Sequence, residues 1–266
     1  MTRNHRLSQT LFPGVPAWAV VALALLAILP HYLNDFYIVY LNKTYVTYLR
    51  VDGRWVLQSL RIGKWVMWAL DLAVYLALPV LALWLYVRKG WLSWQAFDFP
   101  TERPGKDILI GLLLFAALWL AFFFKAFQWD PWLRDLVPRA GYFAFFYTPR
   151  DGWLLYILMS LYLGLAAGFL EEFLYRSFLI RALERAGLAT WQAGVVSVVL
   201  FVFIHAVAGA HFWVGALLAG TVFTLYYIRY RNIVPLVTAH AAIDIAWISG
   251  LGDRLAGPLA RWLGLA

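Results

Sequence analysis

Seven long apolar runs, each close to the length of a membrane-spanning helix, constrain this chain more than any other feature. A helix needs about 20 apolar residues to cross the hydrocarbon core of a bilayer. Of the 266 residues, 64% are hydrophobic and only 14% are charged, which is too little charge to cover a soluble domain of this length. The sequence therefore predicts an all-α fold, a polytopic transmembrane helix bundle of about seven to eight spans. We place spans at Val15–Ile38, Trp65–Val87, Ile108–Phe127, Trp153–Leu170, Trp191–Ala208, Phe212–Ile228 and Ile233–Ser249.

The segments between these runs are expected to be connectors. Asn42–Lys64 mixes basic with apolar residues, so it could lie on the membrane as an amphipathic segment or be a basic loop. Phe97–Lys106 and Trp129–Asp151 contain several prolines, which is typical of connectors. We expect one membrane domain overall, with N-terminal transmembrane helices and connectors in 1–150, a second group of helices in 151–250 and a short tail in 251–266.

The Lys and Arg residues that give the chain its net charge of +8 are expected to lie beside lipid headgroups. Lys and Arg in membrane proteins gather at helix ends beside anionic headgroups, so membrane lipids are the expected partner and no nucleic acid is expected. The absence of cysteine excludes disulfides, thiolate metal sites and a cysteine nucleophile. In the C-terminal half, the basic residues fall on one side, which the positive-inside tendency places in the cytoplasm: Arg176, Arg181, Arg185, Arg229 and Arg231.

Three polar clusters interrupt the last apolar runs, and ionisable groups inside spans are functional candidates because they are costly to bury in lipid. The first cluster contains Glu171, Glu172 and Arg176. On an α-helix, Glu172 and Arg176 are one turn apart and favour an ion pair, while Glu171 points about 100° away and stays free for other work. The alternative is a helix end that emerges from lipid with ordinary surface charges.

The second cluster is the run Phe201–His205, and the third contains His240 and Asp244, four residues apart on one helical face. A carboxylate can fix the tautomer and ring angle of a histidine. Either histidine could instead be a packing residue that hydrogen-bonds to a neighbouring helix. The three clusters can converge on one pocket only if the helix that carries Glu171 extends past Arg176.

In order, EExxxR, FxxxH and HxxxD on hydrophobic helices resemble the motifs of the CPBP family of intramembrane proteases. This family includes the CAAX prenyl endopeptidases of the Ras-converting type and the bacteriocin-processing and immunity (ABI) relatives. The resemblance covers about Trp153–Gly250. It implies an intramembrane endopeptidase that hydrolyses a peptide bond in a membrane-associated peptide or protein, which could be prenylated. It also implies an integral membrane protein, in the plasma membrane of a bacterium, with its active site toward the cytoplasm.

Carried over by position, the resemblance implies a role for each motif residue. Glu171 and His205 would activate the hydrolytic water, and His240 and Asp244 would line the oxyanion side. Glu172 and Arg176 would support them.

Cofactor use and function class stay open at this point. CAAX enzymes of this family typically carry Asn where this chain has Asp244, which must then be protonated or orient His240. The sequence requires no cofactor, but Glu171, His205 and His240 could hold a divalent metal such as Zn²⁺. A metal-free glutamate–histidine site explains the same residues. The alternatives in function are a proton-coupled transporter and a non-catalytic membrane immunity or partner protein.

Overall fold

The computed structural model describes residues 14–51, 54–60, 69, 71–92, 99, 102–133, 153–205 and 210–249. The expected tail at 251–266 and residues 134–151 of the second connector lie outside the described residues. Each of the seven apolar runs has most of its described residues on a helix, so the helical architecture is confirmed.

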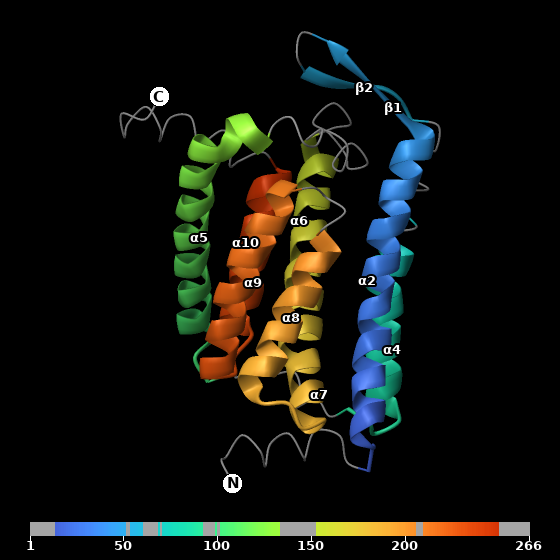
Figure 1. Cartoon of the computed structure of the whole chain (residues 1–266), viewed down its shortest axis with the longest axis vertical. Coiled ribbons are helices and arrows are strands. Elements are labelled where there is room, and N and C mark those ends of the chain that lie inside the picture. Colours follow the sequence, from blue (N-terminus) through green and yellow to red (C-terminus); the bar gives the residue numbers. More distant parts are fainter. Residues whose placement is uncertain are drawn as a thin grey trace.

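The first half of the chain supplies helices at two sides of the bundle (Figure 1). Helix α2 spans Ala17–Tyr45. The π-helix η1, Leu72–Ala77, continues directly into α4, Leu78–Arg88, and this helix packs beside α2. Helix α5 spans Pro104–Leu133 on the other side of the bundle.

A β-hairpin follows α2, where the sequence analysis expects an amphipathic surface segment or a loop. Strand β1, Val46–Val51, pairs antiparallel with β2, Arg54–Leu60. Both strands are rich in β-branched and aromatic residues, which favour extended backbone. The residues between them are Asp52 and Gly53, a dipeptide typical of two-residue hairpin turns. The structure therefore adds a hairpin that the sequence analysis does not predict, and the expected contact of this segment with the membrane stays a prediction.

The longest continuous helix in the described residues carries the first motif. Helix α6, Trp153–Glu171, passes into the π-helix η5, Glu172–Leu179, and then into α7, Ile180–Arg185. Gly187 ends it with φ +102°, a conformation that residues other than glycine rarely adopt. The helix thus extends past Arg176, as convergence of the three motifs requires.

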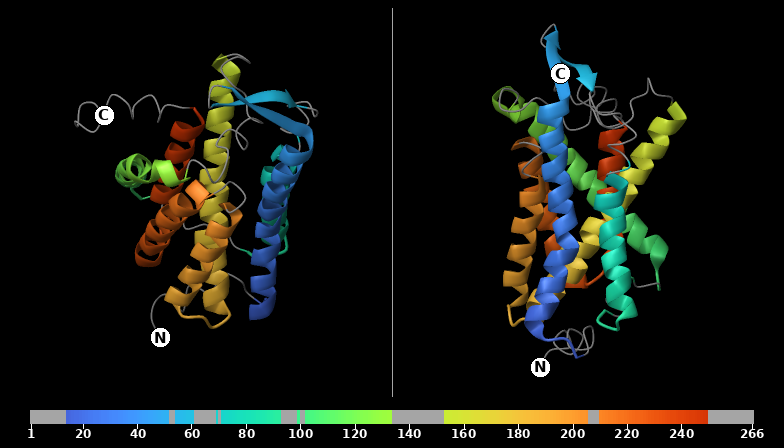
Figure 2. Two further views of the ribbon diagram at one scale, coloured as in Figure 1. Left: turned by 45° about the horizontal axis from the view of Figure 1, so that its top comes forward. Right: turned by 90° about the vertical axis from the view of Figure 1, so that its right-hand side faces the viewer.

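Three further helices complete the bundle. They are α8, Thr190–Ile204, α9, Ala210–Tyr230, and α10, Val234–Ile248. Helix α10 lies between α5 and α6 and makes its most extensive contacts with these two helices (Figures 1 and 2).

Glycines allow α10 to approach its neighbours closely. A Cβ atom on Gly164 would lie 2.5 Å from Ile245 Cγ1, and one on Gly168 would lie 2.8 Å from the backbone nitrogen of Ala241. A Cβ on Gly111 of α5 would lie 2.5 Å from Thr238 Cβ. Small residues at helix interfaces are the usual means of close packing in membranes. This packing sets the position of the third motif.

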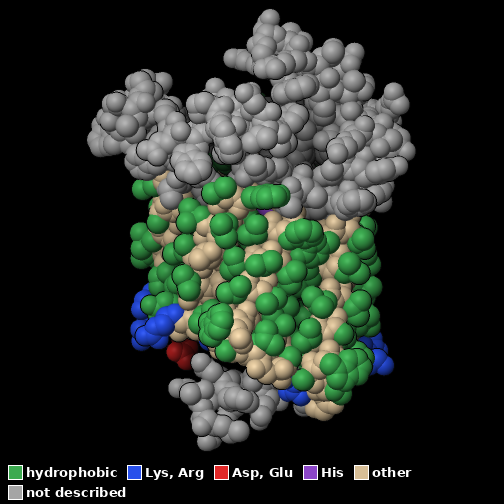
Figure 3. All heavy atoms as spheres, viewed as in Figure 1, with side chains coloured by type: hydrophobic (Ala, Val, Ile, Leu, Met, Phe, Trp, Pro, Cys, Tyr) green, Lys and Arg blue, Asp and Glu red, His purple; other side chains and the backbone are tan. Residues whose placement is uncertain are grey.

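The outer surface is consistent with a membrane protein. Hydrophobic side chains cover the middle of the face in Figure 3, and Lys and Arg gather at its lower edge. Within the described residues, Tyr156–Arg185 is the one helix long and apolar enough to cross a membrane alone, and the count of seven to eight spans stays a prediction. Large exposed hydrophobics occur on most helices, for example Trp18, Leu113, Leu154, Trp191, Phe203 and Leu225.

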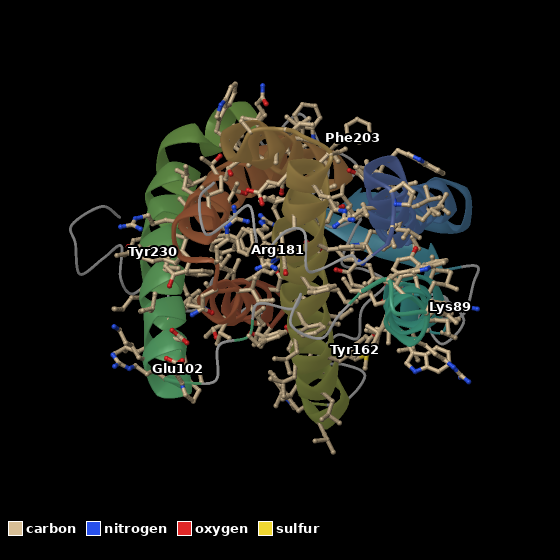
Figure 4. The ribbon with its side chains drawn as sticks, turned by 90° about the horizontal axis from the view of Figure 1, so that it is seen from below. Lys89, Glu102, Tyr162, Arg181, Phe203 and Tyr230 are labelled. Carbon is tan, nitrogen blue, oxygen red and sulfur yellow. The ribbon has the colours of Figure 1, made fainter. Side chains whose placement is uncertain are left out.

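The basic end of the bundle is held by ion pairs and hydrogen bonds. Arg231, in the turn between α9 and α10, donates hydrogen bonds of 3.1 and 2.5 Å to the carboxylate of Glu184 on α7. Burial opposes its charge, but these bonds leave the pKa of Arg231 above its usual value. Arg181, seen from below in Figure 4, donates a 3.0 Å hydrogen bond to the hydroxyl of Tyr227 on α9. These contacts fix α7 against α9 below the site.

Candidate active site

The first motif lies in the buried centre of the bundle. Glu171 is the last residue of α6, and Glu172 and Arg176 lie in the π-helix η5, where every side chain is buried. Glu171 itself is only 6% exposed. The alternative interpretation of this cluster, a helix end that emerges from lipid with solvated charges, is therefore wrong.

Glu172 and Arg176 form the ion pair that their spacing predicts. Arg176 Nη1 lies 3.2 Å from Glu172 Oε1, and both side chains are fully buried. The guanidinium also lies 4.0 Å from the ring centroid of Phe201, at a distance typical of a cation–π contact. Gly220 of α9 leaves room for this stack, because a Cβ there would lie 3.0 Å from Phe201 Cδ1. Phe201 of the second motif thus helps to hold the arginine of the first.

His240 joins the third motif to the first. Its Nδ1 lies 2.7 Å from Glu172 Oε1. A carboxylate oxygen accepts hydrogen bonds, so Nδ1 carries a hydrogen and donates it. Its Nε2 lies 3.8 Å from Glu171 Oε2 and 3.6 Å from Asp244 Oδ2. Glu172 therefore orients the imidazole, and Nε2 faces the space between the other two carboxyl groups.

His205 caps the end of α8 near this cluster. Its Nδ1 lies 2.8 Å from the carbonyl oxygen of Phe201, to which it donates a hydrogen bond. The neutral ring then keeps a lone pair on Nε2. The side chain is partly buried, and its ring centroid lies 4.6 Å from that of Phe201, whose ring in turn lies 5.9 Å from that of His240. The structure thus brings all six predicted residues into one neighbourhood.

Two residues of the site lie outside the predicted motifs. The hydroxyl of Tyr75, in η1, donates a 2.5 Å hydrogen bond to Glu171 Oε1. The ring of His31, in α2, stacks on Tyr75 with centroids 4.4 Å apart and an angle of 12° between the planes. His31 is fully buried. A polar residue inside an apolar run was the one signal available for His31, and Tyr75 has no such signal because tyrosines are frequent in this chain.

The residues present do not form a metal-ligand set. Among the residues that the structure describes, no group of three or more His, Asp or Glu side chains is arranged to hold a metal ion. In both His240 and His205 the Nδ1 atom is hydrogen-bonded, to Glu172 and to a carbonyl, and Nε2 is the remaining ring nitrogen. Metal-ligating histidines usually make the same kind of hydrogen bond with their other ring nitrogen, so the zinc site suggested for Glu171, His205 and His240 stays a prediction, as does a metal-free site.

Comparison with known proteins agrees with the three motifs. The family model described as type II CAAX prenyl endopeptidase Rce1-like matches residues 152–246. This segment belongs to the CAAX protease family. The resemblance drawn from the motifs is confirmed, and all three motifs lie within the matched CAAX protease segment. No curated protein and no solved structure matches the chain.

The match to this family supports a general conclusion about function. Its members are membrane-embedded proteases, so the match supports a protease with a peptide or protein substrate and a membrane location for this chain. The matched CAAX protease segment contains α6 to α10 but not Tyr75 or His31, which come from the preceding half.

Proposed function

We propose that this chain is an intramembrane endopeptidase that hydrolyses a peptide bond in a membrane-associated, prenylated peptide or protein. The nucleophile is a water molecule activated by Glu171 and His205. The observation that carries the proposal is that the two oxygens of the Glu171 carboxylate have different surroundings. Its Oε1 accepts a hydrogen bond from Tyr75, while Oε2 has no hydrogen-bond partner among the described residues and faces His240. A buried carboxylate with one oxygen held and the other open is suited to take a proton from water.

In the proposed reaction, Glu171 accepts a proton from the water, and the water oxygen forms a bond to the carbonyl carbon. His205 contributes the Nε2 lone pair as a second acceptor for that water, because its Nδ1 hydrogen is already donated to the Phe201 carbonyl. When the C–N bond breaks, the proton held by Glu171 passes to the leaving nitrogen.

The oxyanion of the tetrahedral intermediate is stabilised from the opposite side of the site. Since Nδ1 of His240 carries a hydrogen, Nε2 donates a hydrogen bond only when the ring holds both protons. The carboxylates of Glu171 and Glu172 lie within 3.8 Å of its ring nitrogens and favour that cation. Asp244 donates a second hydrogen bond when it is protonated, which matches the amide found in CAAX relatives. Removing one oxyanion donor typically lowers kcat by about 10²–10³.

The site is proposed to lie within the apolar zone and to open to the cytoplasm. Glu171 precedes Arg185 by 14 residues, or about 20 Å along an α-helix. The described Lys and Arg side chains gather at the end where α7 closes the bundle, so we place that end in the cytoplasm of a bacterium (Figure 3). Substrate must then reach Glu171 along a membrane-embedded path, which suits a lipidated peptide.

The decisive experiment measures cleavage by purified protein in proteoliposomes. The probes are an internally quenched peptide with a farnesylated C-terminal CAAX sequence and its unmodified twin. Glu171→Gln and His205→Ala should each lower kcat by about 10²–10⁴, the range for a lost general base. Glu102→Gln, the same chemical change at an exposed site, is the matched control and should retain full activity. Full activity in Glu171→Gln would remove the proposed base.

The same assay separates the remaining alternatives. A strong chelator should leave the rate unchanged, because no metal-ligand set is present in the described residues. Loss of activity with chelator and its return with Zn²⁺ would instead establish a metalloenzyme. A transporter would give proton-coupled flux in these vesicles without cleavage, and an immunity or partner protein would give neither.

A further inference from the structure

The catalytic carboxylate is held by a residue from the half of the chain that the family model does not match. Tyr75 donates its hydroxyl hydrogen to Glu171 Oε1 at 2.5 Å, and the two residues are 96 positions apart. Hydrogen bonds between a hydroxyl and an ionised carboxylate fall at 2.5–2.7 Å and are about twice as strong as neutral ones. Both partners are buried. The bond therefore acts on the carboxylate with little competition from water.

This bond has a geometric consequence for the base. A glutamate side chain has three torsions, and burial alone leaves its terminal carboxylate broad in orientation. Fixing Oε1 on Tyr75 fixes the carboxylate plane, and Oε2 then faces His240 Nε2. Without the Tyr75 hydroxyl, Oε1 would lose this hydrogen bond while the carboxylate stayed buried.

Tyr75 is itself held in place from α2. The His31 ring stacks on it nearly parallel, 4.4 Å away, and His31 is 0% exposed. Offset-stacked rings restrict each other's χ angles and contribute beyond their buried area. Tyr75 lies in the π-helix η1, and Glu171 is the residue that precedes the π-helix η5. Such segments often occur at functional sites, because they change the direction in which side chains point.

We propose that Tyr75 and His31 are positioning residues for Glu171, so that the N-terminal half completes the active site. Tyr75 holds the carboxylate in the orientation in which Oε2 meets water, and His31 holds the ring of Tyr75. This inference rests on the proposed function, because it requires Glu171 to be the base. It implies that the matched segment 152–246 is inactive without α2 and η1.

The test compares two tyrosine-to-phenylalanine variants of the full-length protein in the farnesylated-peptide assay. Tyr75→Phe keeps the stacked ring and removes the hydroxyl. It should lower kcat about 10- to 100-fold, as expected for a lost hydrogen bond to a charged group, with KM within about twofold. Tyr86→Phe is the matched control, because its hydroxyl likewise bonds to another helix, but to the Leu23 carbonyl of α2, at 3.2 Å, and not to Glu171. It should leave kcat unchanged.

His31 is tested by ring replacement. His31→Phe preserves an aromatic ring for stacking and should retain most of the activity, whereas His31→Ala should lower kcat about as much as Tyr75→Phe. A KM-dominated defect in Tyr75→Phe, or equal kcat losses in Tyr75→Phe and Tyr86→Phe, would show a general packing role and overturn the inference.

Comparing Glu171→Gln with Tyr75→Phe distinguishes a failure of this inference from a failure of the proposed function. If Glu171→Gln is inactive while Tyr75→Phe has full kcat, the base stands and the positioning role is wrong. If Glu171→Gln is active, the proposed function fails first. Thermal unfolding of each variant in detergent shows whether it is folded, and the kcat ratio is compared only between variants of equal melting temperature.

Discussion

Close packing of α10 against α6 should be a condition of activity, and Gly168→Ala tests it. The new Cβ would lie 2.8 Å from the backbone nitrogen of Ala241 and 2.9 Å from the carbonyl oxygen of Val237. Carbon contacts are most favourable at about 3.5–4.0 Å, so α10 must withdraw by roughly 0.5–1 Å. Both clashing atoms belong to a helix backbone and cannot rotate away.

The displacement reaches the site directly, because His240 precedes Ala241. The 2.7 Å bond from its Nδ1 to Glu172 Oε1 would stretch to roughly 3.2–3.7 Å, which weakens or breaks it. A misplacement of about 1 Å can lower the rate about 10²-fold, and overpacking typically costs about 1–3 kcal/mol of stability. Gly168→Ala should therefore lower kcat about 100-fold and reduce the melting temperature.

The assay pairs tryptophan-monitored thermal unfolding in detergent with cleavage of the farnesylated peptide. Gly105→Ala is the matched control, since it is also a helical glycine but a Cβ there meets nothing within 4 Å. It should be neutral or slightly stabilising, by up to about 1 kcal/mol, with full activity. Wild-type kcat and melting temperature in Gly168→Ala would refute the packing argument.

Two further predictions concern the oxyanion side and the orientation in the membrane. Asp244→Asn should keep at least a tenth of the activity, because the amide donates a hydrogen bond as a protonated carboxyl does, whereas Asp244→Ala should lose about 10²–10³ in kcat; an inactive Asn variant would mean that the residue acts as an ionised acceptor. The natural absence of cysteine allows single-cysteine labelling of exposed positions at opposite ends of the bundle, with a membrane-impermeant maleimide. In intact bacterial cells Trp153→Cys should react and Ala186→Cys should react only after lysis; the reverse pattern would invert the proposed topology.

The positions of the helices could be predicted because each apolar run is long and continuous enough to favour a buried or lipid-facing helix. The hairpin after α2 was within reach of the sequence as well, through Asp52 and Gly53, but the sequence analysis did not predict it. The site residues of the second half were likewise predictable. Glu171, His205 and His240 are ionisable groups inside apolar helices, and such groups stand out because burying them is costly.

Other features of the site needed the folded chain. The π-helical turns at η1 and η5 carry no distinctive composition, and they set the directions of Tyr75 and Arg176. Spacing correctly paired Glu172 with Arg176, but the i,i+4 rule also suggested that Asp244 orients His240. In the structure Glu172 makes the closer contact, at 2.7 Å against 3.6 Å. Contacts between distant segments decide which carboxylate pairs with His240, and spacing along one helix does not describe those contacts.

The sequence by itself determined that this chain must form helices in a membrane and which ionisable residues are too costly to be there by chance. Burial costs depend on residue type and on the length of an apolar run, and both can be read in one dimension. Only the tertiary structure decided that α2 and η1 join the site, since the bond from Tyr75 to Glu171 links residues 96 positions apart. It depends on how α2 packs against η1 and η5, and the stacking of His31 on Tyr75 is part of that packing.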